Sequence, residues 1–181
     1  MSAAYGLAAQ ALLVAWFVWK LAARSPSRYR RLFAASGAAL ALIRLVDGVS
    51  AAMALRALWG DPSITTAQLL LLSLAGRPAN LGRAPAAALA LFGIVFYPLA
   101  LGLGNVDPYR FGYAAWPLVA VLGAAALLAW RRGQPLYLWL LAVDLAAYAI
   151  GLHASSNLWD ILFDPLLVIA AVVIAARTPR R

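Results

Sequence analysis

Seven apolar segments joined by loops of only a few residues constrain this chain more than any other feature of its sequence. About 20 apolar residues span a bilayer as an α-helix, so a chain of 181 residues has room for seven helices and little else. The sequence predicts an all-α integral membrane protein, a seven-transmembrane-helix bundle that forms one domain over residues 1–181. The expected helices cover 5–23, 33–58, 62–80, 86–104, 113–130, 135–152 and 158–177.

Apolar residues make up 65% of the chain, and the mean hydropathy is +0.85. A soluble domain contains about 45–50% apolar residues, so this composition is typical of a membrane protein. The net charge of +9 comes from basic residues that gather in alternate loops and in the C-terminal tail. Because basic loops stay in the cytoplasm, we expect the N-terminus outside and the C-terminus inside, in a bacterial cytoplasmic (inner) membrane. Loops this short exclude nucleic acid as a partner.

The segment 62–80 is the doubtful one of the seven, because only fifteen of its residues, Pro62 to Gly76, precede Arg77. A re-entrant hairpin is the alternative to a short or tilted span. The hairpin would invert the charge bias of every later loop, so we favour a span.

The chain has no cysteine and one histidine. A thiolate metal site, an iron–sulfur cluster and a bis-histidine haem are therefore excluded. The cofactor is otherwise unknown, and a divalent cation bound by carboxylates stays possible.

Three polar residues in the last segment share one face of the expected helix, because Asn157, Asp160 and Asp164 are spaced by three and four. Asn157 suits the N-cap of a helix that starts at residue 158, with Asp160 in its first turn. Asp164 then lies deeper, before a kink at Pro165, and has no capping role. This indicates a site in which Asp164 and Asp160 are catalytic carboxylates or ligands of a metal ion.

Further candidates lie in or near the predicted outer loops. His153 could act as a general base on a substrate in the outer leaflet. The loop 105–113 carries Asp107, Tyr109 and Arg110, which together with Asn157 could bind a lipid headgroup. Arg56 is expected at the outer interface, next to Asp61 or a lipid phosphate.

Charged residues also fall at the centres of two expected helices. Arg44 and Asp47 share a face of the segment 33–58, and Asp144 and Tyr148 share a face of 135–152. We expect these four residues to meet in one cluster at the midplane of the membrane. The cluster could lock the two helices together, or serve as a proton relay or a cation site.

Three functions remain open at this point. The first is a lipid-binding or partner-binding accessory subunit, associated with membrane lipid, other membrane subunits or copies of itself, with an acidic site that opens outward. The second is an aspartate- or metal-dependent enzyme acting on a lipid headgroup or a lipid-linked substrate. The third is a proton-coupled transporter that uses Arg44, Asp47 and Asp144. Whether the chain is an enzyme is not decided by its motifs, which identify no family.

Overall fold

The chain folds mostly into helices, as the sequence predicts. The computed structural model describes residues 2–77, 79 and 81–177. In chain order its elements are α1 (Ser2–Leu21), η1 (Ala22–Arg24), α2 (Ser27–Leu42), β1 (Arg44–Val46), β2 (Val49–Ser50), α3 (Ala51–Trp59), α4 (Ile64–Leu74), α5 (Arg83–Ala100), η2 (Tyr109–Gly112), α6 (Trp116–Arg131), α7 (Pro135–Ala149), α8 (Leu158–Leu162) and α9 (Pro165–Ala176). Among the described residues, two helices are long and apolar enough to cross a membrane, Ala3–Arg24 and Arg83–Ala100.

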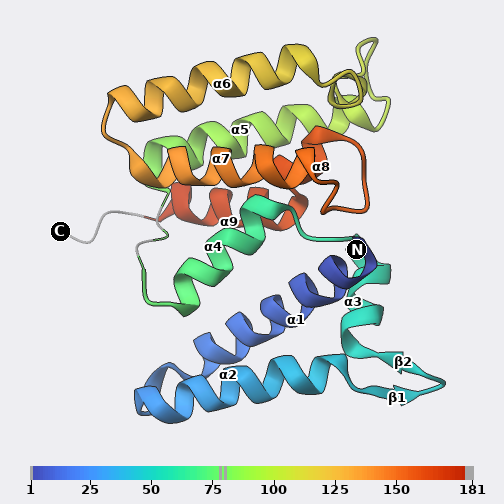
Figure 1. The fold of residues 1–181 in the computed structure, drawn as a ribbon, viewed down its shortest axis with the longest axis vertical. Helices are drawn as coiled ribbons and strands as arrows, with labels where there is room; N and C mark the ends of the chain where they lie inside the picture. Colours follow the sequence, from blue (N-terminus) through green and yellow to red (C-terminus); the bar gives the residue numbers. More distant parts are fainter. Residues whose placement is uncertain (1, 78, 80, 178–181) are drawn as a thin grey trace.

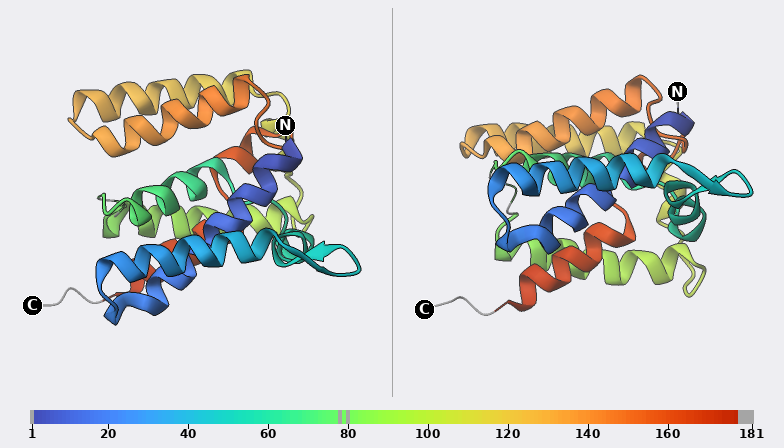
Figure 2. Two further views of the ribbon diagram at one scale, coloured as in Figure 1. Left: turned by 60° about the horizontal axis from the view of Figure 1, so that its bottom comes forward. Right: turned by 90° about the horizontal axis from the view of Figure 1, so that it is seen from below.

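Three antiparallel helix pairs surround the short helix α4 (Figure 1, Figure 2). α1 packs on α2, α5 on α9, and α6 on α7, while α4 contacts α1, α7 and α8. Small residues let two of the pairs approach closely, because Gly93 of α5 lies against Val168 of α9 and Gly37 of α2 lies against Val18 of α1. Residues 62–68, which lead into α4 and form its first turn, are all buried. The start of α4 is therefore part of the core of the molecule.

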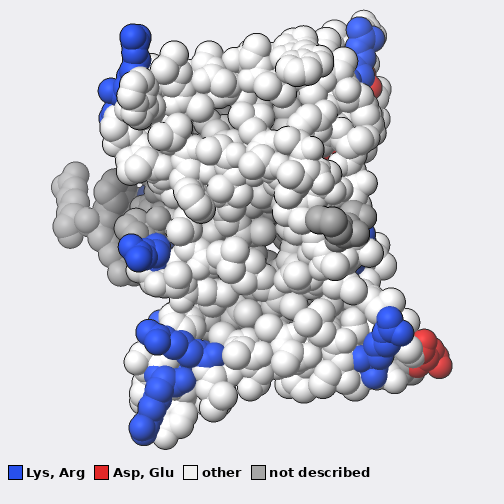
Figure 3. Space-filling view, in the orientation of Figure 1, with Lys and Arg blue, Asp and Glu red and all other residues white. Residues whose placement is uncertain are grey.

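The connections between helices gather at two ends of the molecule (Figure 1). The hairpin end, on the right, holds the start of α1, the β1–β2 hairpin and the connections before α4, after α5 and after α7. The arginine end, on the left, holds the connections after α1, α4 and α6 and the end of α9. In Figure 3 the charged side chains lie toward these two ends, with an uncharged belt between them. The loops alternate between the ends in the predicted order.

The predicted helix over 33–58 is wrong, because the chain leaves α2 and forms a two-stranded hairpin over 44–50 before α3. Asp47 has φ 51° and Gly48 has φ 75°. Positive φ at both central residues is the geometry of a type I′ turn, for which Asp-Gly is a favoured pair. Arg44 and Asp47 are consequently exposed on the hairpin and do not lie in the middle of a helix.

The prediction of one kinked helix over 158–177 is also wrong. The chain becomes extended at Phe163, with φ −155° and ψ 155°, and this residue separates α8 from α9. Pro165 occupies the first position of α9, where the missing N–H costs no hydrogen bond. The prediction assumed that the segment must span a bilayer alone, whereas α8 is a short helix packed on α4 and α7.

Candidate functional site

The polar centre of the molecule is the segment 60–68, which we name the α4 hub. Two side chains of α1 donate hydrogen bonds to its first carbonyls. Gln10 Nε2 lies 2.7 Å from the Gly60 oxygen, and the Tyr5 hydroxyl lies 2.7 Å from the Pro62 oxygen. These bonds satisfy carbonyls of the connection before α4, and they attach α1 to the start of α4.

Asp164 joins the first turns of α4 and α9. Its Oδ1 accepts the N–H of Leu167 at 2.8 Å, and its Oδ2 accepts the N–H of Ser63 at 2.5 Å. Both are backbone donors at helix starts, which need a side-chain acceptor when they are buried. The argument that Asp164 cannot be a cap was therefore wrong, because α9 starts directly after it. The proposed catalytic and metal-binding roles of Asp164 and Asp160 stay predictions.

Asp144 faces the α4 hub from α7 and is 1% exposed. The Thr65 hydroxyl donates to its Oδ2 at 2.6 Å, and Gln68 Nε2 donates to its Oδ1 at 2.8 Å. In the described part of the chain, no Lys or Arg side chain forms an ion pair with Asp144. Gln68 Oε1 is buried and has no hydrogen-bond partner among the described residues. The carboxyl group is thus held by neutral donors next to an unused acceptor.

The predicted midplane cluster does not form. Arg44 and Asp47 are exposed at the hairpin end, whereas Asp144 is buried against the α4 hub and Tyr148 lines a groove between α6 and α7. The prediction failed because it placed Arg44 and Asp47 on a continuous helix at the depth of Asp144.

A crevice of about 300 Å³ opens next to Asp144, and we name it the α5–α7 crevice. Its walls are leucine, aromatic and proline side chains. The polar groups that line it are those of Thr65, Asp144, Tyr137 and Trp159, of which the Tyr137 hydroxyl donates to the Leu81 carbonyl. The complete lining is Thr65, Leu81, Pro85, Leu89, Phe92, Leu122, Tyr137, Leu140, Leu141, Asp144, Trp159, Leu162, Phe163 and Leu167. The crevice is thus an apolar space with a buried acidic group at its wall.

At the hairpin end, the structure brings together Asn157, Asp160 and Tyr109, and the predicted substrate-binding and catalytic roles of these residues stay predictions. The Tyr109 hydroxyl donates to Asp160 Oδ2 at 2.7 Å, and Asn157 Nδ2 donates to the Tyr109 carbonyl at 3.0 Å. Asn157 caps α8 as expected, with its Oδ1 accepting the N–H of Trp159. Burial, and then the hydrogen bond to Asp160, raises the pKa of Tyr109 above its usual range. These contacts fasten the 105–112 loop to α8.

The other predicted headgroup residues lie apart from this group or on its edge. Asp107 accepts the N–H of Tyr109 at 2.9 Å in a local turn, and Arg110 is exposed. Arg56 meets Asp61, as anticipated, through two hydrogen bonds of 2.5 and 2.8 Å. Since the side chain of Asp61 is only 4% exposed, this ion pair belongs to the α4 hub rather than to a lipid-facing surface.

His153 is buried against Tyr5 of α1, with the ring centroids 5.5 Å apart. Its Nδ1 accepts the N–H of Ser155 at 3.1 Å, so Nε2 carries the proton in the neutral ring. Nε2 is buried and has no hydrogen-bond partner among the described residues. A role as general base stays a prediction.

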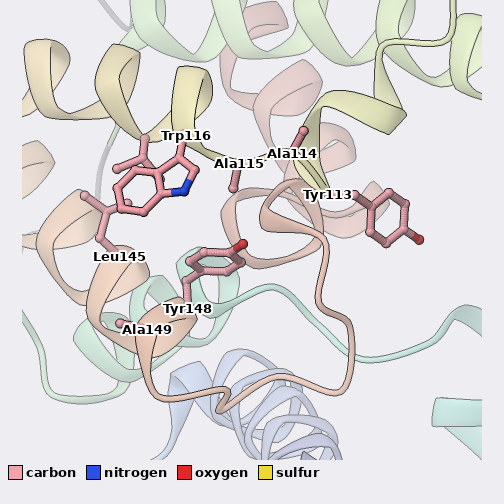
Figure 4. A pocket seen from close by; sticks show the side chains of 8 residues that line it. Tyr113, Ala114, Ala115, Trp116, Leu145, Tyr148 and Ala149 are labelled. Atoms are coloured by element: carbon pink, nitrogen blue, oxygen red, sulfur yellow. The ribbon is translucent and has the colours of Figure 1, made fainter.

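A second hollow, of about 450 Å³, lies at the hairpin end between the start of α6 and the end of α7 (Figure 4). Trp116 and Tyr148 lie on its two sides, and the side chain of Tyr113 points away from them. The remaining lining is Ala114, Ala115, Val119, Leu145 and Ala149. This groove has no charged side chain in its lining, which distinguishes it from the α5–α7 crevice.

Apart from Asp144, the residues of the α5–α7 crevice were missed in the sequence, because they come from six helices and from the connections that hold Leu81 and Phe163. The available signal was the cluster of Thr65, Thr66 and Gln68 in an otherwise apolar segment. Within the described residues, no group of three or more His, Asp or Glu side chains could hold a metal ion. Comparisons with protein-family models, curated proteins and solved structures gave no match to this chain.

Proposed function

We propose that this chain is a small polytopic membrane protein that binds one alkyl chain of an amphiphile in the α5–α7 crevice. The observation that carries the proposal is the crevice itself. Its walls are mostly apolar, and one of the few polar groups in them is a buried carboxyl group. Ligand sites are commonly 300–1,000 Å³ in volume, mostly apolar, and oriented by a few polar groups. An alkyl chain would fill the leucine-lined part and leave its polar end beside Thr65 and Asp144.

The membrane part of the proposal is supported by the surface of the helices. Large apolar side chains project from α5, α6 and α9, including Leu91 at 65%, Leu127 at 51% and Ile169 at 60% exposure. Contiguous apolar surface of this kind is costly in water and is typical of a face that contacts lipid or another protein. The charged residues lie toward the ends of the helices (Figure 3). Short α4 need not span a bilayer, because its first turn is buried within the bundle.

The proposed orientation places the hairpin end outside and the arginine end in the cytoplasm of a bacterial cell, following the positive-inside rule. Because the chain has no native cysteine, single cysteines report on this directly. Val106→Cys at the hairpin end should react with an impermeant maleimide added to intact spheroplasts, and Gln134→Cys at the arginine end should react only after lysis. The reverse pattern would contradict the orientation, and labelling of both in intact spheroplasts would contradict the spanning topology.

The binding part is tested with a diazirine-bearing dodecyl alcohol and purified protein in a non-ionic detergent. We expect the photoproduct to map to residues of α5 and α7 that line the crevice. Leu89→Trp should fill the crevice and reduce labelling about tenfold, the factor that corresponds to about 1.4 kcal/mol. Leu91→Trp is the matched control, since Leu91 lies on the same helix with its side chain exposed. Equal labelling of wild type and Leu89→Trp would contradict the proposal.

A further inference from the structure

We infer that the crevice selects an amphiphile with a protonated primary amine, whose ammonium group binds to Asp144 and Thr65. This inference rests on the proposed alkyl-binding function and identifies the chemical class of the ligand. It starts from the hydrogen bonds of Asp144, a residue of the crevice wall whose carboxylate has unused acceptor positions.

An ionised carboxylate offers about four lone-pair positions, and the two oxygens of Asp144 receive one hydrogen bond each, from Thr65 and Gln68. Gln68 Oε1 adds an acceptor that is buried and unpartnered among the described residues, on a side chain that is 6% exposed. Buried acceptors are normally satisfied, so an unused one beside a half-used carboxylate indicates a missing donor. Asp144 and Thr65 line the crevice and Gln68 does not, so a bound molecule can supply a donor to the free positions of the Asp144 carboxylate.

The charge balance points to a cationic donor. Within the described chain Asp144 has no Lys or Arg partner, and a buried carboxylate without a cation is costly. An ammonium group carries three donors, no acceptor and one positive charge, which matches what this part of the crevice lacks. A hydroxyl group supplies one donor and no charge. A fatty-acid carboxylate supplies no donor and would be repelled by Asp144.

The shape of the crevice fits a single alkyl chain attached to that group. Tyr137 precedes Asp144 by seven residues on α7, and Pro85 precedes Phe92 by seven residues on α5. Both separations correspond to about 10 Å along a helix. All four residues line the crevice, so its apolar part extends about this far along both helices.

Three probes of equal chain length test the inference: dodecylamine, dodecanol and dodecanoate, each titrated into the purified protein in a non-ionic detergent near neutral pH. Binding is followed by native mass spectrometry, and thermal unfolding provides a second readout. We expect dodecylamine to bind about tenfold more tightly than dodecanol, because hydrogen bonds to charged groups are the stronger ones, and dodecanoate to bind most weakly. Asp144→Asn should abolish the preference for the amine. Asp47→Asn is the matched control with the same charge change on the exposed hairpin, and it should leave the preference intact.

The outcomes separate the two proposals. If dodecylamine and dodecanol bind equally and Leu89→Trp weakens both, the ammonium site is refuted and the alkyl-binding function stands. If no probe binds, or if Leu89→Trp weakens none of them, both proposals fail. If the amine preference persists in Asp144→Asn, or falls equally in Asp47→Asn, the preference comes from general electrostatic attraction and the inference is overturned. If Asp144→Asn does not fold, the relative affinities of the wild-type protein for dodecylamine, dodecanol and dodecanoate still test the ammonium site.

Discussion

The α4 hub and the β1–β2 hairpin place similar residues in opposite environments. Asp144, against the hub, and Asp47, in the hairpin, both follow short apolar runs in the sequence, yet one is buried and the other exposed. In the hub, the Gly60 carbonyl, the Thr65 hydroxyl and the Ser63 N–H are paired with groups of α1, α7 and the start of α9. In the hairpin, the Asp-Gly turn leaves the side chain of Asp47 exposed beyond the helices. The difference shows that local turn chemistry, rather than the hydropathy of the neighbours, decides where a charged residue lies.

The largest effect is expected from Asp164→Ala, which removes both the α9 cap and the acceptor for Ser63 N–H. Loss of a cap costs about 1 kcal/mol, and a buried unpaired N–H costs about 1–3 kcal/mol, so we expect a loss of about 3 kcal/mol. Denaturant unfolding in detergent measures it. Asp164→Asn keeps one cap acceptor and should be destabilised less. A loss in Asp164→Ala below about 1 kcal/mol would show that the hub does not depend on this carboxylate.

A smaller loss should follow from breaking the ion pair at the edge of the hub. Arg56→Ala leaves the carboxylate of Asp61, 4% exposed, without its cation. Breaking a fully buried pair costs about 3–5 kcal/mol, but the Arg56 side chain is 31% exposed, so solvent reduces the expected loss to about 2 kcal/mol. Arg44→Ala on the exposed hairpin is the control and should stay close to wild type. Similar unfolding midpoints for Arg56→Ala and Arg44→Ala would contradict the claim that the ion pair of the hub stabilises the fold more than the exposed Arg44 of the hairpin does.

Much of the fold could be predicted from the sequence, because long apolar segments indicate helices and the charged residues mark the loops between them. The helical class, the order of the loops at the two ends and the N-cap at Asn157 were predictable. The hairpin was missed although its signal, Asp47-Gly48 flanked by valines, is a strong one. The separation of α8 from α9 was missed because every apolar segment was assumed to span a bilayer by itself.

The candidate site was less predictable for a different reason. Asp144 was identified as important, but its partners Thr65 and Gln68 lie more than seventy residues away. Spacing arguments apply within one helix and do not show which helices are neighbours. By contrast, the loops that carry Tyr109 and Asn157 were expected at the same end, although the hydrogen bond from Tyr109 to Asp160 was not predicted.

Tyr109→Phe tests a contact of intermediate strength outside the hub. Losing one hydrogen bond to a carboxylate should cost about 1–2 kcal/mol below pH 10. The pKa of Tyr109 is raised in the folded protein, so the hydroxyl keeps its proton in the fold at pH values where the unfolded chain loses it. This contribution is complete below the unfolded pKa of about 10 and is lost as the pH rises through the folded value. The difference between wild type and variant should therefore shrink at strongly alkaline pH, and a constant difference would contradict the assignment.

The smallest effect is expected from Asp47→Asn in the hairpin. Asparagine tolerates positive φ, so the turn is kept while the charge is removed, and the free energy of unfolding should change by less than about 0.5 kcal/mol. Asp47→Val keeps the position uncharged but introduces a β-branched residue at φ 51°, which should cost about 1–3 kcal/mol. Comparing the two in the same unfolding assay separates charge from backbone conformation. If Asp47→Asn were as destabilising as Asp47→Val, the charge of Asp47 would have a stabilising partner. That result would contradict the contrast between the exposed hairpin and the buried hub.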